Sequence, residues 1–353
     1  MTPDELDSIS YLPSIRSRLA ELRGYRELRA ETKAGLRPIV SLGKLGQVSD
    51  AVRVLERISD SVSTEYFVDL NVAPGQTCDD YDGLCDPASN YQAWRNLVAG
   101  EARAVPVALL RDNSTERPFV RQVLEIERRY GVVAMRSRRP AQDLPALQAA
   151  LAAVDDVNNL LVVLDFGYIR GSMDAKEQEA LRMVSALRNI DAATRIAVMA
   201  SSFPKAVSAY GDRRGTLEIL EREFHADVGG DEVAIYGDHA AIYPEPFEPS
   251  ISRFVPRIDY CLDEAWLYER HRANDGEDGG YVECARQLVA LPEWEEDFAD
   301  RAWGADKIRE TAAGRIPQGF GSPANWIAAR VNMHIERQHS RIVQEDDSDE
   351  DEE

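Results

Sequence analysis

The sequence predicts a TIM-like (β/α)8 barrel with a C-terminal helical appendage. Short apolar segments alternate with helical patterns from residue 36 onward, which is typical of βα units around a parallel sheet. Eight strand candidates fall within about 235 residues, close to the ~250 residues of a (β/α)8 barrel. An open doubly wound sheet is the alternative, because periodicity alone does not show closure. The first strand candidate is followed by no GxGxxG, and the chain has no Walker motif, which argues against a dinucleotide-binding fold.

Residues 1–35 are expected to form an N-terminal helical lead-in, because leucines at helical spacing alternate there with charges of both signs. The barrel is expected to span residues 36–272. Its strand candidates are short apolar runs bounded by charges or turn residues. They are residues 36–42, 66–72, 104–111, 132–136, 160–164, 195–200, 233–236 and a segment within 258–268.

The helices between these strands are expected where apolar residues recur every three or four positions. They are residues 48–62, 91–99, 115–130, 144–154, 174–190 and 216–224. The connection 73–90 is rich in Gly, Asp and Pro and longer than a routine βα loop. Its length predicts either a functional flap or an insert.

Beyond residue 272 the pattern changes to a Gly- and Asp-rich loop, 274–280, followed by helical segments. We expect residues 273–342 to form a helical appendage packed on the barrel. Residues 343–353 are almost entirely acidic and contain too little apolar surface to fold. They are therefore expected to form a disordered acidic tail.

The chain carries a formal net charge of −21, and the last nine residues supply eight of the negative charges. An acidic body disfavours broad binding to duplex DNA, because phosphate contacts need clustered Lys and Arg. No apolar run approaches the ~20 residues of a membrane helix, and the N-terminus has no signal-peptide core. Four cysteines match neither a zinc pattern nor a CxxC motif. These features predict a cytoplasmic protein without a membrane partner.

Charged and polar residues follow several strand candidates, and the carboxyl ends of barrel strands converge on one mouth. Asp69 and Asp165 are the candidate catalytic residues, because a carboxylate beside buried apolar residues needs a partner or a function. Other strand-end residues are candidates for ligand binding: Asn71, Arg111, Arg136, Tyr168, Ser201 and Asp238. Arginine forks bind phosphate and carboxylate groups, so the expected ligand is an anionic small molecule or nucleotide.

Other readings of these residues stay open. Asp69 and Arg111 could form a purely structural ion pair across the barrel. No cofactor is predicted and the spacing requires no metal site, although Mg²⁺ or Mn²⁺ could bind oxygen ligands from Asp69, Asp165 and Asp238. His239 and His334 are the histidines nearest to candidate site positions.

Motifs spread over the chain carry a family resemblance. The opening Tyr11-x-Pro13 with Gly24 and Arg37-Pro38-Ile39-Val40 resembles the start of the bacterial and phage beta family proteins. Further motifs that resemble this family are Glu21, Glu27, Val255-Pro-Arg-Ile-Asp-Tyr260, Trp266, Arg270, Trp326 and Asn332-Met333-His334-Ile335, in which Met333 replaces the first histidine of the family's pair. The resemblance implies a barrel-like α/β protein of phages and mobile islands with no agreed activity, associated with phage–host conflict.

The first hypothesis is therefore a phage- or mobile-element-associated barrel that binds an anionic ligand at its carboxyl-end mouth: a nucleotide, a phosphate ester or a nucleic-acid end. A phage or host protein is a further candidate partner. One alternative is a metal-assisted phosphoester hydrolase that uses Asp69 and Asp165 at the same mouth. Another is an acidic interaction protein that imitates nucleic acid for a basic partner. The sequence leaves open whether the protein is an enzyme.

Overall fold

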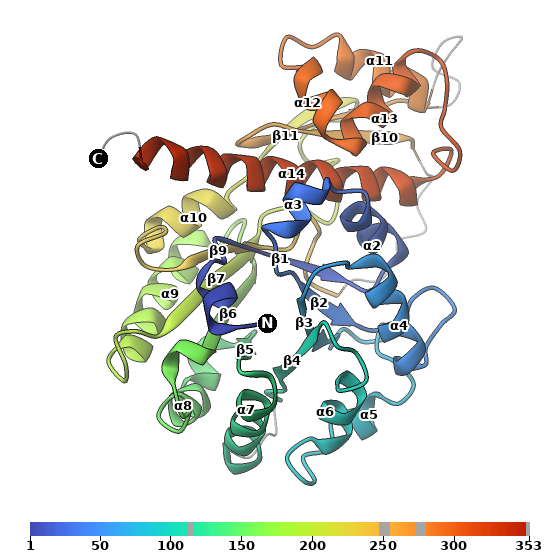
Figure 1. The fold of residues 1–353 in the computed structure, drawn as a ribbon. Coiled ribbons are helices and arrows are strands. Elements are labelled where there is room, and N and C mark those ends of the chain that lie inside the picture. Colours follow the sequence, from blue (N-terminus) through green and yellow to red (C-terminus); the bar gives the residue numbers. More distant parts are fainter. Residues whose placement is uncertain (112–115, 247–254, 273–279, 351–353) are drawn as a thin grey trace. The chain divides into compact units, whose positions relative to one another are not determined.

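Eight parallel strands form a closed barrel with helices around its outside (Figure 1). The barrel order is β1-β2-β3-β4-β5-β6-β7-β9. Closure comes from β1, which pairs in parallel with both β2 and β9. The strands are β1 (Tyr11–Arg16), β2 (Ile39–Leu42), β3 (Tyr66–Leu70), β4 (Ala104–Ala108), β5 (Val133–Ser137), β6 (Leu160–Tyr168), β7 (Arg195–Ser201) and β9 (Ile235–Asp238). The predicted fold class is confirmed in this computed structural model.

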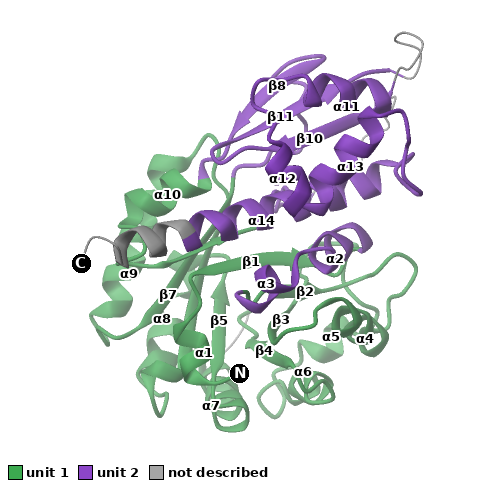
Figure 2. Cartoon of the chain, turned by 45° about the horizontal axis from the view of Figure 1, so that its top comes forward, with its two compact units in different colours: residues 1–18, 36–201, 221–239 green, residues 19–35, 202–220, 240–353 purple. Residues whose placement is uncertain are grey.

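The structure describes residues 1–111, 116–246, 255–272 and 280–350, and side chains as far as Val343. Two compact units interleave along the chain, as the two colours of Figure 2 show. Unit 1 comprises residues 1–18, 36–201 and 221–239 and contains the barrel. Unit 2 comprises residues 19–35, 202–220 and 240–353.

The prediction that all eight barrel strands lie beyond residue 36 was wrong. The first strand, β1, lies in the segment that was expected to be a helical lead-in. Pro13 and Ser14 interrupt its apolar run, and a proline within a run argues against a central strand. The pairing of Leu12 with Gly237 and of Ile15 with Val40 nevertheless places β1 between two barrel neighbours.

The segment predicted as the eighth barrel strand forms an antiparallel hairpin instead. Its strands are β10 (Arg257–Cys261) and β11 (Ala265–Arg270), and β11 pairs further with β8 (Arg214–Glu218) in unit 2. The acidic pair Asp263-Glu264 lies in the turn and divides the apolar run into two alternating strands, which is the antiparallel pattern. The predicted helix 216–224 was also misplaced, since β8 occupies its first residues.

The outer helices of unit 1 begin where the sequence supplies helix-start signals. Asp50 caps α4 by accepting a hydrogen bond from the Arg53 backbone N–H at 2.9 Å, and Pro140 opens α8. The helices of this unit are α1 (Pro3–Asp7), α4 (Ala51–Ser61), α5 (Tyr81–Leu84), α6 (Gln92–Val98), α7 (Glu116–Tyr130), α8 (Pro140–Leu151), η1 (Val157–Asn159), α9 (Met173–Arg188) and α10 (Glu221–Val228). The short α5 lies within the long connection that follows β3.

Unit 2 has its own apolar core between its three-stranded sheet and its helices. Trp266, Tyr260 and Cys284 are members of this core, and each is at most 2% exposed. Its helices are α2 (Leu19–Arg26), α3 (Ala30–Ala34), α11 (Tyr281–Val289), α12 (Glu296–Arg301), α13 (Trp303–Ala312) and α14 (Pro323–Glu350). None of the helices in the part of the chain described by the structure is long and apolar enough to span a bilayer.

The end of the chain differs from the prediction of a disordered tail from residue 343. The backbone of α14 continues to Glu350. Extending an established helix adds one hydrogen bond for each residue fixed, so a packed helix can continue into a polar sequence. Residues 351–353 and most of the predicted loop 274–280 lie outside the described residues.

Candidate functional site

The buried guanidinium of Arg136 joins side chains from four barrel strands. Its Nη2 and Nε donate hydrogen bonds to Asp165 Oδ2 at 2.7 and 3.0 Å. Its Nη1 lies 3.5 Å from Asp69 Oδ2 and 3.5 Å from Ser41 Oγ. Because β2, β3, β5 and β6 supply these groups, they can meet only inside the barrel. Three residues predicted to form the site, Asp69, Arg136 and Asp165, are therefore brought together.

The strand register extends this inward-facing set. Ser41 pairs with Arg16 on β1 and with Asp69 on β3, so these three residues form one row on the inner face. Arg16 is partly buried at the end of β1. It was missed from the sequence because β1 itself was not recognised as a strand. A signal existed, since Arg16 directly follows an apolar residue, Ile15, at a strand end.

Asp165 is held as a carboxylate by several donors. Besides Arg136, His239 Nε2 lies 2.9 Å from Asp165 Oδ1, and the Gly167 backbone N–H donates to the same oxygen at 2.9 Å. Burial alone would raise the pKa of Asp165, but the charges of His239 and Arg136 outweigh burial and hold that pKa well below its ordinary range. Asp165 is thus ionised and buried, and both of its carboxylate oxygens already accept hydrogen bonds. These properties suit it to positioning Arg136 and His239 rather than to accepting a proton.

Arg138 is the more accessible arginine of the site. Its Nη2 donates to Asp69 Oδ2 at 2.5 Å, and its Nε lies 4.0 Å from Asp165 Oδ2. Burial lowers the pKa of Arg138, whereas Asp69 and Asp165 raise it, and the net effect is a raised pKa. Its side chain is 32% exposed, compared with 1% for Arg136. Arg138 therefore carries a permanent positive charge on a partly exposed side chain beside the buried ion pairs.

A β-bulge shapes the end of β6. The register between β6 and β7 shifts between Asp165 and Tyr168, and Gly167 adopts a positive φ of 60° there. Residues three apart normally face opposite sides of a strand, but the additional residue returns Tyr168 to the side of Asp165. Tyr168 pairs with Ser201, which follows Met199 by two positions on the inner face of β7. The bulge thus places Tyr168 on the same side as Asp165, whereas ordinary alternation along β7 places Ser201 there.

Asp238 is not part of the inward-facing set. It accepts hydrogen bonds from the hydroxyls of Tyr11 and Tyr236, each at 3.0 Å, and it is fully buried. The Tyr236 ring lies under Arg222 of α10, at 3.8 Å, so this group faces the outer helices. Alternation along β9 places Gly237 and His239 inward and Asp238 outward. The prediction that strand-end residues converge on the mouth identified the correct position of Asp238 along β9, but not the face of the strand on which its side chain lies.

Two further predicted ligand residues are engaged with the long connection after β3. The guanidinium of Arg111 lies 4.8 Å from the centre of the Tyr81 ring on α5. Asn71 is buried, and its Oδ1 accepts a hydrogen bond from the Ala73 backbone N–H at 3.0 Å. The Asp69 carboxylate is held by Arg136 and Arg138, and its pairing with Arg111 stays a prediction.

A metal centre was considered from the sequence for three aspartates. Asp69 and Asp165 share the inner face, but Asp238 faces outward, so the predicted trio is not assembled. In the part of the chain that the structure describes, no three His, Cys, Asp or Glu side chains are grouped in a way that could hold a metal ion. Binding of Mg²⁺ or Mn²⁺ to this protein stays a prediction.

The fold and the site define a closed parallel α/β barrel whose strand ends carry paired arginines and aspartates at the mouth. The family model described as Beta protein matches residues 11–340, and the chain therefore belongs to the Beta protein family. The chain is similar to "Protein beta" of Enterobacteria phage P4, with 32% identity over 336 residues, 94% of this chain and 93% of that protein. The resemblance drawn from short motifs is confirmed.

Some of the residues that carried the resemblance hold unit 2 together. Asn332 Oδ1 accepts a hydrogen bond from the Gly304 backbone N–H at 2.9 Å, and its Nδ2 donates to Gly24 O at 3.3 Å. A Cβ on Gly24 would lie 2.6 Å from Ala328 O. The Asn332 amide therefore ties α14 to α13 and α2, and the glycine permits their close approach. His334 stacks on Trp266, with 5.5 Å between the ring centres.

Proposed function

We propose that the barrel mouth binds an anionic ligand that carries a phosphate or carboxylate group, such as a nucleotide or another phosphate ester. The observation that carries this proposal is the partly exposed Arg138 side chain, whose guanidinium lies beside two carboxylates already paired with the buried Arg136. A preorganised guanidinium fork forms strong paired hydrogen bonds with such groups. The inner-row residue Arg16 adds a second cation at the strand ends.

The local charge balance supports an anion rather than a cation. The guanidinium groups of Arg136 and Arg138 pair with the carboxylates of Asp69 and Asp165, and Arg16 lies in the same inner row as Asp69. An acidic protein body does not prevent a local pocket of positive potential.

The alternative of a hydrolase that uses Asp165 as a base or metal ligand has less support from the geometry. Both oxygens of Asp165 accept hydrogen bonds, from Arg136, His239 and the Gly167 backbone, and its pKa lies well below the ordinary value. A general base is most effective with a pKa near the working pH. Binding is therefore the better-supported role for this mouth.

The test is to measure binding of inorganic phosphate and of nucleotides by calorimetry in the wild type and in Arg138→Gln. The matched control is Arg139→Gln, because Arg139 has 33% side-chain exposure and pairs with Asp143. Loss of a charge-assisted pair should weaken binding by about tenfold or more in Arg138→Gln and should leave the control unchanged. Equal binding in both variants, or no anion binding by the wild type, would contradict the proposal.

Membership of the Beta protein family and similarity to a phage protein also support the prediction of a role in phage–host conflict. That role would depend on the barrel mouth if the anion bound there is the signal that the protein detects or the substrate on which it acts. Plaque counts on bacteria that express the wild type, Arg138→Gln or Arg139→Gln test the link. The prediction is that only Arg138→Gln alters the outcome of infection at equal protein levels.

A further inference from the structure

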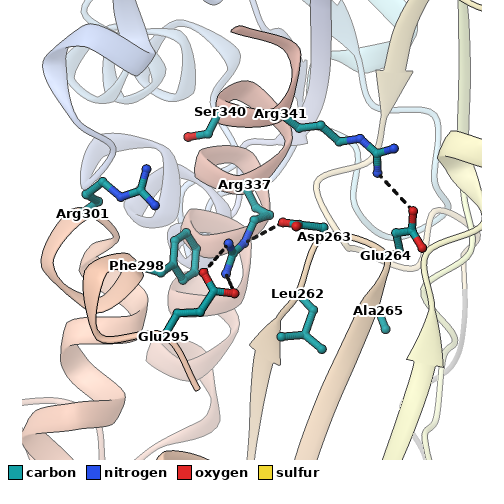
Figure 3. Close-up of a pocket in the computed structure, with 10 residues that line it drawn as sticks. All are labelled: Leu262, Asp263, Glu264, Ala265, Glu295, Phe298, Arg301, Arg337, Ser340 and Arg341. Atoms are coloured by element: carbon teal, nitrogen blue, oxygen red, sulfur yellow. Dashed lines mark hydrogen bonds and ion pairs between the residues drawn. The ribbon is translucent and has the colours of Figure 1, made fainter. Parts of the chain in front are cut away.

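A pocket of about 660 Å³ lies within unit 2, remote in sequence from the residues of the barrel mouth (Figure 3). The turn between β10 and β11, residues 262–264, forms one side together with Ala265, the first residue of β11. Glu295 and Phe298, at the start of α12, form another, and Arg337 and Arg341 of α14 form a third. We call it the hairpin pocket.

Arg337 is fixed as part of the wall of the hairpin pocket. Its guanidinium lies 3.7 Å from the centre of the Phe298 ring, and its Nη1 bonds Glu295 at 2.9 Å. Its Nε lies 3.4 Å from Asp263 Oδ1. A guanidinium stacked on an aromatic ring and paired on its edges has few donors left for an incoming anion.

In each ion pair of the hairpin pocket the carboxylate is much more exposed than its arginine. The side-chain exposures are 44% for Glu295 and 65% for Asp263, compared with 9% for their partner Arg337. Glu264 is 81% exposed, compared with 30% for Arg341, from which it lies 3.8 Å away. Among the paired groups, a ligand therefore meets the carboxylates before the arginines, and the exposed Arg301 also lines the space.

The shape and lining of the hairpin pocket favour a large organic cation over a metal ion. Within the described residues, no three acidic or other metal-ligating side chains are close enough to share an ion. Arg301 and Arg341 also line the space and, together with Arg337, balance the charges of its three carboxylates, so a compact ion gains little there. An extended side chain could instead place its apolar stem against Leu262 and Ala265 and its charged head at the rim carboxylates.

We propose that the hairpin pocket receives an arginine side chain from a basic segment of a partner protein. The guanidinium would exchange the loose pairing of Glu264 with Arg341 for direct bonds to Glu264 and Asp263. A planar fork matches carboxylates better than an ammonium does, so arginine is favoured over lysine. The net charge of −21 would steer a basic partner toward this protein.

The experiment measures binding of short capped peptides that contain glycine with arginine, lysine or glutamate, by fluorescence anisotropy at low salt. The proteins are the wild type, the double variant Asp263→Asn/Glu264→Gln and the control Asp60→Asn/Glu31→Gln. The control makes the same change in net charge at carboxylates that are each 70% exposed and lie elsewhere. The wild type and the control should prefer the arginine peptide, and the pocket variant should bind it about tenfold more weakly.

Equal loss of affinity in the control and pocket variants would overturn the proposal, because it would show a general charge effect. Preference for the glutamate peptide would overturn it as well, because it would show that Arg301 and Arg341 make the pocket select anionic ligands. No detectable binding of the arginine peptide to the wild type would also refute it. These outcomes are independent of Arg138→Gln, so the hairpin pocket and the barrel mouth can fail separately.

Discussion

Replacing Arg136 with methionine should destabilise the barrel more than any other single substitution at the mouth. Methionine fills a similar length of apolar space but removes every donor. In the wild type these donors hold Asp165 at 2.7 and 3.0 Å and approach Asp69 at 3.5 Å. The substitution thus leaves two carboxylates, each less than 5% exposed, with fewer partners.

Breaking a buried ion pair by removing one partner typically costs 3–5 kcal/mol. Here each carboxylate keeps a second cationic neighbour, since His239 remains beside Asp165 and Arg138 beside Asp69. We therefore expect a cost near the lower limit, about 3 kcal/mol. In the double variant Arg136→Met/Asp165→Asn the loss should be smaller than the sum of the single losses by about 1 kcal/mol or more, because the two groups contact each other.

Hydrogen exchange followed by mass spectrometry is the suitable assay, because a chain with two compact units need not unfold in one step. Peptides from β5 and β6 report the opening free energy of the barrel alone. The control is Arg139→Met, whose partly exposed ion pair with Asp143 should contribute no more than about 1 kcal/mol. A loss below about 1 kcal/mol in Arg136→Met, or strictly additive losses in the double variant, would refute the account of Arg136 as the hub of the site.

Three further outcomes follow from the structure. Because the pKa of Asp165 is lowered in the folded state, its ionisation contributes stability that is complete above the unfolded-state pKa of about 3.9. This stability is lost as the pH falls toward the folded-state pKa, so Asp165→Asn should flatten the acid side of the pH–stability profile. Burial raises the pKa of the Cys284 thiol to about 12, so iodoacetamide at pH 8 should alkylate it rapidly only after unfolding, as peptide mass spectrometry can show. Gly167→Ala places a side chain at a positive-φ position and should destabilise the barrel by about 1 kcal/mol. Phosphate binding should also weaken if the bulge that directs Tyr168 relaxes. Unchanged stability in hydrogen exchange would contradict this prediction.

The sequence was most informative where burial is complete. The run Leu160–Leu164 is apolar at every position because β6 is buried on both faces, and this pattern identifies a parallel strand without knowledge of the fold. Parallel strands direct their carboxyl ends to one side, so Asp69, Arg136 and Asp165 could be expected to meet from their positions alone. The structure confirms that meeting.

The rest of the site depends on features that local patterns do not encode. Whether Asp238 faces inward depends on the register of β9, and a shift of one residue reverses every side chain of a strand. Tyr168 reaches the inner face only through the bulge at Gly167. Arg16 depends on recognising β1, in which Pro13 conceals the strand pattern. Register, bulges and strand order are all tertiary properties.

The inner ring of charges has a consequence for how the mouth can act. Asp165 and Arg136 already pair with each other inside the barrel, and the surrounding strands fix their positions before a charged ligand arrives. The second carboxylate, Asp69, shares its Oδ2 between Arg136 and Arg138. An anion that binds Arg138 would compete with Asp69 for the same guanidinium. The buried Arg136 could then take over Asp69, so that binding at the surface is coupled to the charge balance in the barrel interior.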